Sequence, residues 1–190
     1  LTLYFKRSEG KLVGALTTHV DDLAIVGEPH FVDTLISSLS SKFQVSTDNY
    51  LHHFISLKIT CNVNQGFVFL HQAHYIDELC ECFLKGKHTS VATRADSNFK
   101  NCKSQGDLSL GPYNQIFGSL LWVSQCTLPH FSFVVNRLSQ HLCDPAESHW
   151  QAAIWTLNYL VSTKHLKVRL GGKLKLSGFS DSDWAEDRDN

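Results

Sequence analysis

The sequence lacks several features that would place it in a familiar class of protein. Its 190 residues include no methionine and four prolines, and no N-x-S/T glycosylation acceptor occurs. Charged residues or histidines interrupt every apolar run well short of the ~20 residues that a membrane span needs. No G-x-S-x-G, P-loop or G-x-G-x-x-G motif is present. We therefore expect a soluble intracellular protein of the cytoplasm or nucleus, without a membrane anchor.

The ends of the sequence and its cysteines indicate a piece of a longer intracellular chain. Without methionine there is no initiator residue, and the sequence opens inside an apparent strand, "LTLYFKR", and stops in the charged run "WAEDRDN". We expect a fragment of a polyprotein. The six cysteines follow no dense spacing of a disulfide framework, so reduced thiols are expected.

Composition describes a globular chain with no overall basic field. Hydrophobic residues make up 43% and charged residues 18% of the sequence, which suffices for one or two compact domains with real cores. Seventeen Lys and Arg against 18 Asp and Glu give a formal net charge of −1. The overall charge therefore gives no indication of a nucleic-acid binder, although a local basic patch remains possible.

Hydrophobic periodicity predicts β-structure and then a helix, twice in succession. Residues 1–27 alternate as strands with a turn at "SEGK" and a second turn at the acidic pair of "TTHVDDLAIVG". Apolar residues at steps of four predict a helix over 29–43, with a proline near its start. A second hairpin is expected over 54–72, followed by a helix over 73–84.

The second half has a different character. Residues 85–112 are rich in Lys, Ser, Gly, Asp and Asn, lack periodicity and are expected to form a linker. From Tyr113, three segments carry apolar residues at helical steps, and prolines separate them. The final segment, "LKVRLGGKLKLSGFSDSDW", returns to alternating strands around Gly171 and Gly172.

Asp21 and Asp22 are the strongest candidate for chemistry. Adjacent carboxylates at a hairpin tip offer hard oxygen ligands to a divalent metal, and two-metal phosphoryl transfer requires such ligands. Asp-Asp is also a common turn dipeptide. The spacing alone therefore favours an ordinary turn.

Longer motifs in a consistent order add to this reading. "HVDDLAIVG" resembles the YVDD box of reverse transcriptases, in the form seen in copia-type LTR retrotransposons. "FISLKI", "GFVFLHQAHYIDELCECF" and the long segment from "YNQIFGSLLW" to "LNYLVST" are similar to successive segments of that family. "LSGFSDSDWAED" resembles the opening of the attached ribonuclease H. The chain is thus identified as resembling a copia-type Pol polyprotein along nearly its whole length.

The resemblance implies an α+β fold in four parts. Residues 1–95 would be the end of the reverse-transcriptase palm, with β-hairpins and packed helices, and the thumb. Residues 96–112 would be a linker, 113–170 a helical connection region, and 171–190 the truncated first strands of an RNase H-like domain.

The resemblance also implies site residues, a cofactor and a partner. Asp21 would be a palm metal ligand, and Asp22 its weaker or orienting neighbour. Asp181 would be the first metal-binding carboxylate of ribonuclease H, with Asp183 as the less favoured candidate. The complete enzyme would use Mg²⁺ and a primer–template of RNA and DNA.

Both implied active sites are incomplete, which leaves the activity open. The family's upstream palm aspartate and the later acidic residues of ribonuclease H fall outside these 190 residues. His19 replaces the tyrosine of the box, and family cations are replaced at four positions, Leu128, Ile154, Trp155 and Val161. Two interpretations follow: a polymerase fragment that is inactive alone, with weak affinity for nucleic acid, or a decayed copy that acts as a non-catalytic interaction module.

Three smaller patterns each have a structural alternative. His71, His74, Cys80 and Cys82 have the composition of a zinc site, but ordinary packing is favoured because cysteines two apart on a helix face different ways. Helical spacing favours a core role over base stacking for four aromatic residues, Trp122, Trp150, Trp155 and Tyr159. Five cations could form one small basic face: Lys164, Lys167, Arg169, Lys173 and Lys175.

Overall fold

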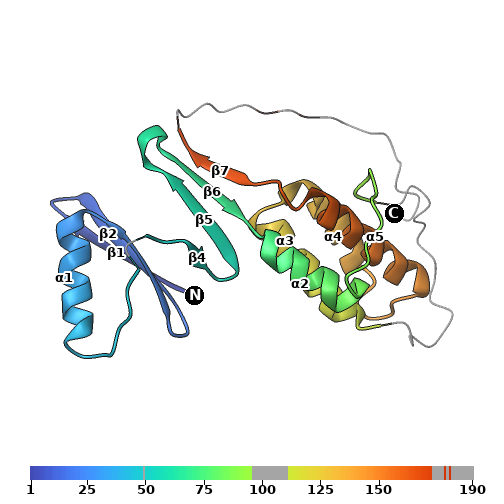
Figure 1. Cartoon of the computed structure of the whole chain (residues 1–190), viewed down its shortest axis with the longest axis horizontal. Helices are drawn as coiled ribbons and strands as arrows, with labels where there is room; N and C mark the ends of the chain where they lie inside the picture. Colours follow the sequence, from blue (N-terminus) through green and yellow to red (C-terminus); the bar gives the residue numbers. More distant parts are fainter. Residues whose placement is uncertain (49, 96–110, 173–177, 179, 181–190) are drawn as a thin grey trace.

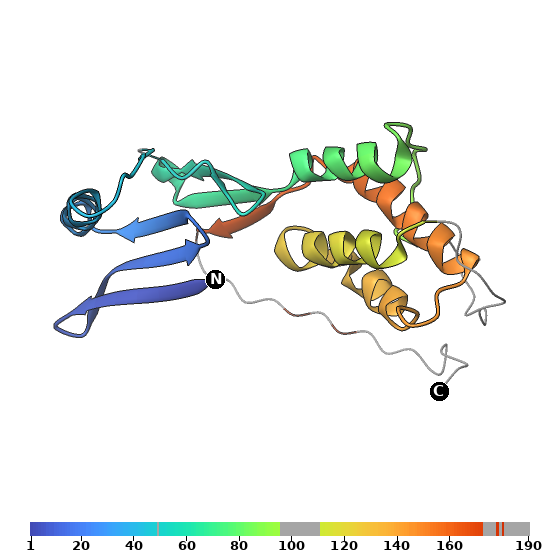
Figure 2. The same cartoon turned by 90° about the horizontal axis from the view of Figure 1, so that it is seen from below.

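A computed structural model of the chain describes residues 1–48, 50–95, 111–172, 178 and 180. Three groups of elements follow one another along the long axis of the molecule (Figures 1 and 2). A small sheet with one helix lies at one end, a second sheet lies in the middle, and a group of helices lies at the other end.

The first sheet is an antiparallel meander of β1 (Thr2–Ser8), β2 (Lys11–His19) and β3 (Asp22–Gly27). Glu9 and Gly10 form the first turn with φ values of 49° and 80°. The second turn follows His19, whose register partner is Asp22. The three strands and both turns predicted for residues 1–27 are confirmed.

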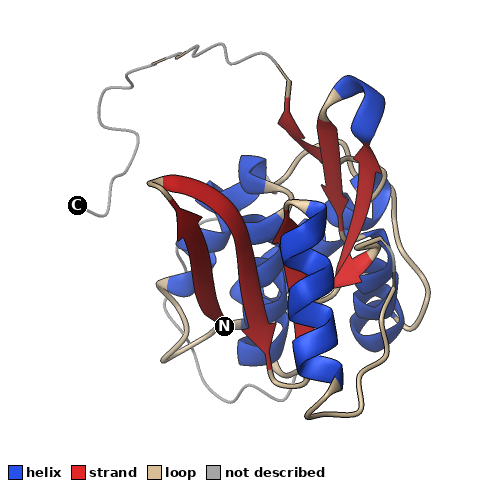
Figure 3. Ribbon diagram, turned by 90° about the vertical axis from the view of Figure 1, so that its left-hand side faces the viewer, coloured by secondary structure: helices blue, strands red, loops and turns tan. Residues whose placement is uncertain are grey.

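Helix α1 (Pro29–Ser40) covers one face of this sheet (Figure 3). Pro29 occupies the first turn, where its missing N–H costs no hydrogen bond. A Cβ placed on Gly14 would lie 2.3 Å from the ring of Phe31, so the absence of a side chain lets the helix approach the strand. The predicted helix over 29–43 is therefore confirmed, although it ends at Ser40 and leaves Phe43 65% exposed.

The opposite face of the first sheet is largely open among the described residues. Leu3, Phe5 and Val26 lie on that face, since the register places them opposite the face of Gly14, and they are 54%, 61% and 65% exposed. Ala24, between them, is buried. This part of the chain consequently buries little apolar surface of its own.

The second sheet contains β4 (His53–Phe54), β5 (Leu57–Asn62), β6 (Phe67–His71) and β7 (Val168–Gly171), in that order and all antiparallel. The short 3₁₀ helix η1 (Val63–Gln65) links β5 and β6, which confirms the predicted second hairpin. Strand β7 comes from the far end of the described chain and pairs with β6. This long-range pairing had no signal in the local sequence pattern.

The main core lies among four helices: α2 (Ala73–Leu84), α3 (Tyr113–Cys126), α4 (Ser132–Ser139) and α5 (Glu147–Thr163). A 3₁₀ helix, η2 (Pro129–Phe131), leads into α4. Ile116, Leu120 and Leu157 are fully buried, as is Phe131 of η2. Helix α2, from the part predicted as palm and thumb, shares this core with the three later helices. The domain boundaries at 95, 112 and 170 stay a prediction.

Buried hydrogen bonds connect these helices. Tyr113 Oη donates to the carbonyl oxygen of Leu138 at 2.8 Å, and burial raises the pKa of Tyr113 to about 12. Thr127 Oγ1 donates to Oε1 of Gln72 at 2.8 Å, which links the end of α3 to the start of α2. Both contacts satisfy polar atoms that would otherwise be costly to bury.

The fold class predicted from the sequence holds at the coarse level. The chain is a mixed α and β protein with two antiparallel sheets and a mostly helical second half. None of the described helices is long and apolar enough to cross a bilayer. Of the strands expected around Gly171 and Gly172, β7 is observed and ends at Gly171, whereas residues 173–177, 179 and 181–190 lie outside the described part.

Candidate metal-binding hairpin and basic surface

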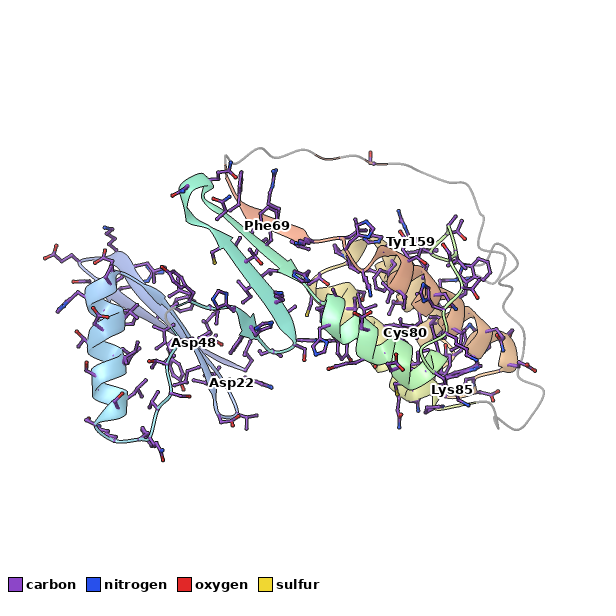
Figure 4. The ribbon with its side chains drawn as sticks, in the orientation of Figure 1. Asp22, Asp48, Phe69, Cys80, Lys85 and Tyr159 are labelled. Carbon is purple, nitrogen blue, oxygen red and sulfur yellow. The ribbon has the colours of Figure 1, made fainter. Side chains whose placement is uncertain are left out.

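Asp21 and Asp22 lie at the exposed tip of the β2–β3 hairpin. His19 and Asp22 form the last register pair, so Val20 and Asp21 make a two-residue loop. Both aspartates are exposed, and Figure 4 shows Asp22 at this end of the first sheet. Strands β2 and β3 support the tip, and both carboxylates are accessible to solvent or to a ligand.

Val20 holds an unusual backbone conformation beside the two aspartates. Its φ is 54°, although it is β-branched, and it is 91% exposed. A positive φ at the first of two loop residues is where hairpins normally use glycine, and a bulky residue there costs of order 1–3 kcal/mol. Val20 is too exposed for packing against the described residues to offset this cost. Strain of this kind is typical of functional turns, and sequence inspection missed it because it depends on φ.

The hairpin by itself offers fewer ligands than a metal site would need. Two carboxylates suit Mg²⁺, but an octahedral ion needs further ligands. Within the described ranges, no group of three or more His, Cys, Asp or Glu side chains is placed to hold a metal. Asp181 and Asp183 lie outside the described residues, so their predicted role stays a prediction.

We expect the double substitution of Asp21 and Asp22 by Asn to change the free energy of unfolding by no more than about 0.5 kcal/mol, the usual range for exposed sites. The carboxylates have no buried partner, and removal of two adjacent negative charges relieves their mutual repulsion. Urea unfolding of both proteins measures the difference. A loss of several kcal/mol would show that the pair is structural.

Within the part of the chain that the structure describes, the cysteine and histidine pattern at the end of β6 and in α2 forms no group of three or more side chains placed to hold a metal. Cys80 is buried in the core, whereas Cys82 is exposed. Nε2 of His74 lies 3.4 Å from Oε1 of Glu78 on the exposed side of α2. His71 lies at the end of β6. The core position of Cys80 and the prediction that the two cysteines face different ways are confirmed, whereas the exposure of Cys82 shows no packing role for it.

The aromatic residues of the helices divide between core and surface. Trp150 belongs to the core and meets the ring of Phe83 edge-on, with centroids 6.4 Å apart. Trp155 is half-buried and donates from Nε1 to the carbonyl of Thr93 at 3.0 Å. The hydroxyl oxygen of Tyr159, which is labelled in Figure 4, lies 3.4 Å from Nε2 of His130. Trp122 is half-buried on α3.

Three of the five cations predicted to form one basic face lie within the described residues. Lys164 forms a salt bridge with Asp77 and so belongs to the α2–α5 contact. Lys173 and Lys175 lie outside the described residues. Lys167 and Arg169 are exposed at and beside β7. Pairing of β7 with β6 brings these two cations to the second sheet instead.

Three of the four positions at which the resemblance implied cations carry apolar side chains that pack in the core. Leu128 is 3% exposed and Val161 is 6% exposed, and both belong to the core. Ile154 packs against the same core. In this chain, these three apolar side chains contribute to the helical core.

Comparison with known proteins identifies the relatives of this chain. It is 30% identical over 199 residues to the retrovirus-related Pol polyprotein from transposon TNT 1-94 of Nicotiana tabacum, which covers 99% of the chain. It is 32% identical over 194 residues to the corresponding polyprotein from transposon RE1 of Arabidopsis thaliana, which covers the whole chain. The chain is a relative of copia-type retrotransposon Pol polyproteins. The resemblance inferred from the motifs is therefore confirmed.

These Pol relatives are much longer than this chain. It spans 15% of the tobacco polyprotein and 13% of the Arabidopsis one. A different relative, the secreted RxLR effector protein 161 of Plasmopara viticola, is 40% identical over 78 residues, which are 40% of this chain and 55% of the effector. No family model and no solved structure matches the chain.

Proposed function

We propose that the chain is a piece of a copia-type reverse transcriptase and ribonuclease H that carries half of the polymerase metal site and is inactive alone. The exposed pair Asp21 and Asp22 at a strained hairpin tip carries this proposal. Similarity to retrotransposon Pol polyproteins over the whole length supports it. In the parent polyprotein, Asp21 would bind Mg²⁺, Asp22 would orient the site, and an RNA or DNA primer–template would be the partner.

The geometry of the β2–β3 hairpin explains why Asp21 and Asp22 could bind a metal ion and why they would not complete a two-ion site. An antiparallel pair with a two-residue loop fixes the carboxylates on rigid strands, and metal ligands need such a support. In-line displacement also needs ions that clamp both the attacking and the leaving oxygen. Two carboxylates on one turn cannot hold such a pair of ions. The remaining ligands must then come from another segment of the parent protein.

We expect the isolated chain to extend no DNA primer on an RNA template in the presence of Mg²⁺ or Mn²⁺ and deoxynucleoside triphosphates. The missing ligands prevent assembly of the two-ion site. A gel-based primer-extension assay with a complete reverse transcriptase as positive control measures this. Template-dependent incorporation by the purified chain would contradict the proposed incompleteness.

A graft tests the positive half of the proposal. Residues 17–27 of this chain would replace the aligned segment of the Arabidopsis RE1 Pol polyprotein, with and without Asn at Asp21 and Asp22. We expect primer extension by the chimera to persist and the Asn version to lose at least about 100-fold, since each ion loses a charged ligand. Equal activity of the two chimeras would remove these aspartates from the chemistry.

A second candidate function is a non-catalytic interaction module derived from a retrotransposon. One observation favours it: a relative that aligns with this chain over 78 residues is named as a secreted effector rather than as a Pol polyprotein. The reading frame that encodes the parent protein distinguishes the two candidates. An upstream palm aspartate in that frame favours the polymerase, and a frame without one favours the module.

A further inference from the structure

Strand β1 is an edge strand whose apolar side chains are exposed on both faces of the first sheet. Among the described residues it pairs with β2 alone, so its second edge presents unpaired backbone groups. In Figure 2, β1 is the darkest blue strand, at the outer side of this sheet. Leu3 and Phe5 lie on the open face and Tyr4 on the face of α1, and all three are more than half exposed. Edge strands of soluble proteins are usually protected against such exposure.

The part of the molecule that carries β1 has little core of its own. Among residues 1–48, only Gly14 and Ala24 are buried. Sheets of globular proteins most often contain about four to six strands, and this one has three. Further strands beside β1 would therefore stabilise this part of the chain, because they would pair its open edge and cover its exposed side chains.

The sequence of β1 is complementary to itself. Two copies of an edge strand that are related by a two-fold axis run antiparallel, and equivalent faces of the two sheets then lie on the same side. Residues that stand opposite each other share a face, so a residue meets its own copy or one an even number of positions away. A two-fold axis at Phe5 pairs all seven residues of β1 with the second copy. Tyr4 then stands opposite Lys6, and Leu3 opposite Arg7.

The two cations of β1 favour this register over its neighbours. An axis at Lys6 or at Arg7 would set a cation against its own copy, which is destabilising. An axis at Tyr4 avoids that repulsion but pairs only residues 2–6. With the axis at Phe5, the ammonium of Lys6 can lie over the Tyr4 ring of the second copy, and the two Phe5 rings form a cross-strand pair. Both charges thus find an uncharged partner.

We propose that β1 is a homodimer interface, at which the first sheets of two copies of this chain join through antiparallel β1 strands. Strand addition of this kind gains affinity from main-chain hydrogen bonds and specificity from side chains at alternate positions. One strand from each copy makes a small interface, so the dissociation constant should be on the order of 1–100 µM. Asp21 and Asp22 take no part in it, and it is therefore independent of the polymerase proposal.

Sedimentation velocity of the 190-residue chain over a concentration series tests this interface. A reducing agent is needed because Cys61, Cys82 and Cys143 are exposed. We expect exchange between monomer and dimer in the parent chain. Phe5→Lys sets like charges against each other at the axis and should weaken the dimer at least about 10-fold. Phe133→Lys makes the same change at an exposed residue of α4 and should leave the dimer unchanged.

A charge exchange tests the register of the two strands. Leu3→Lys sets a new cation against Arg7 of the second copy and should weaken the dimer about 5-fold or more. Addition of Arg7→Glu to this variant pairs opposite charges at the same positions and should restore the dissociation constant to within about 3-fold of the parent value. Addition of Lys42→Glu instead changes the net charge equally at an exposed residue away from β1 and should restore nothing.

Circular dichroism confirms that each variant is folded. A parent chain that stays monomeric up to about 300 µM overturns the proposal, since that concentration exceeds the expected dissociation constant. Equal weakening by Phe5→Lys and Phe133→Lys overturns it as well, because association would then be nonspecific. A dimer that Phe5→Lys leaves intact, or that Arg7→Glu restores no better than Lys42→Glu, places the interface elsewhere and contradicts the assignment to β1.

Discussion

Replacement of Phe131 by alanine is expected to lower the free energy of unfolding of the helical part by about 3–5 kcal/mol, the usual range for a fully buried aromatic residue. Phe131 is 0% exposed and lies in η2 at the entrance to α4, within the core of the four helices. Its ring also contacts His130, with centroids 5.7 Å apart. Truncation leaves a cavity among side chains that the helix packing holds in place. Such a loss is a large fraction of the stability of a small domain.

The chain offers a matched control two residues away. Phe133 lies on α4 and is 75% exposed, so Phe133→Ala should change stability by about 0.5 kcal/mol or less. Urea denaturation followed by tryptophan fluorescence reports on both variants, because Trp150 lies in the same core. Similar losses of stability in the two variants would contradict the burial of Phe131 and the placement of η2 in the core.

Acidification from about pH 7.5 to pH 5 is expected to destabilise the helical part through a pair of stacked histidines. His149 is 1% exposed, and its ring stacks on that of His141, with centroids 3.7 Å apart and planes 14° apart. Nδ1 of His149 accepts a hydrogen bond from the backbone N–H of Ala146 at 2.8 Å, which fixes the start of α5. This geometry requires an unprotonated Nδ1 in His149.

The pKa shifts give the sign of the effect. Burial lowers the pKa of His149, the nearby His141 lowers it further, and Asp144 opposes the shift. Burial also lowers the pKa of His141, followed by the charge of Arg137. Between the folded pKa values and the unfolded value of about 6.5, the unfolded chain binds more protons. The contribution of these histidines to the free energy of unfolding is thus fully present above about pH 6.5. It decreases as the pH falls from there through the folded pKa values.

Urea midpoints measured across this pH range test the expectation. His149→Gln keeps an acceptor for the Ala146 N–H but cannot titrate, so its stability should vary less with pH than that of the parent chain. His74→Gln, at a side chain that is 91% exposed, should leave the pH dependence intact. A parent chain whose stability is flat down to pH 5, or an unchanged slope in His149→Gln, would contradict the assignment.

Several features of the fold were accessible from the sequence because their causes are local. Alternating residues and turn signals in 1–27 specify neighbouring strands, and the hairpin tip at Asp21 and Asp22 follows from the turn between them. Apolar steps of three and four residues specify α1 to α5 within a few residues. The ordered motifs likewise identified retrotransposon relatives, because a motif is a property of the chain and needs no coordinates.

Tertiary structure decided which distant residues meet. Strand β7 pairs with β6, so Arg169 lies over Phe67, and Lys167 joins Lys58 and His71 on one face, although nothing in the local pattern links these segments. The same pairing separates Lys167 and Arg169 from Lys164, which binds Asp77. The strain at Val20 also required a backbone angle. Local periodicity is set by interactions within a few residues, whereas sheet partners are selected by burial and hydrogen bonding over the whole chain, and a single sequence does not display that selection.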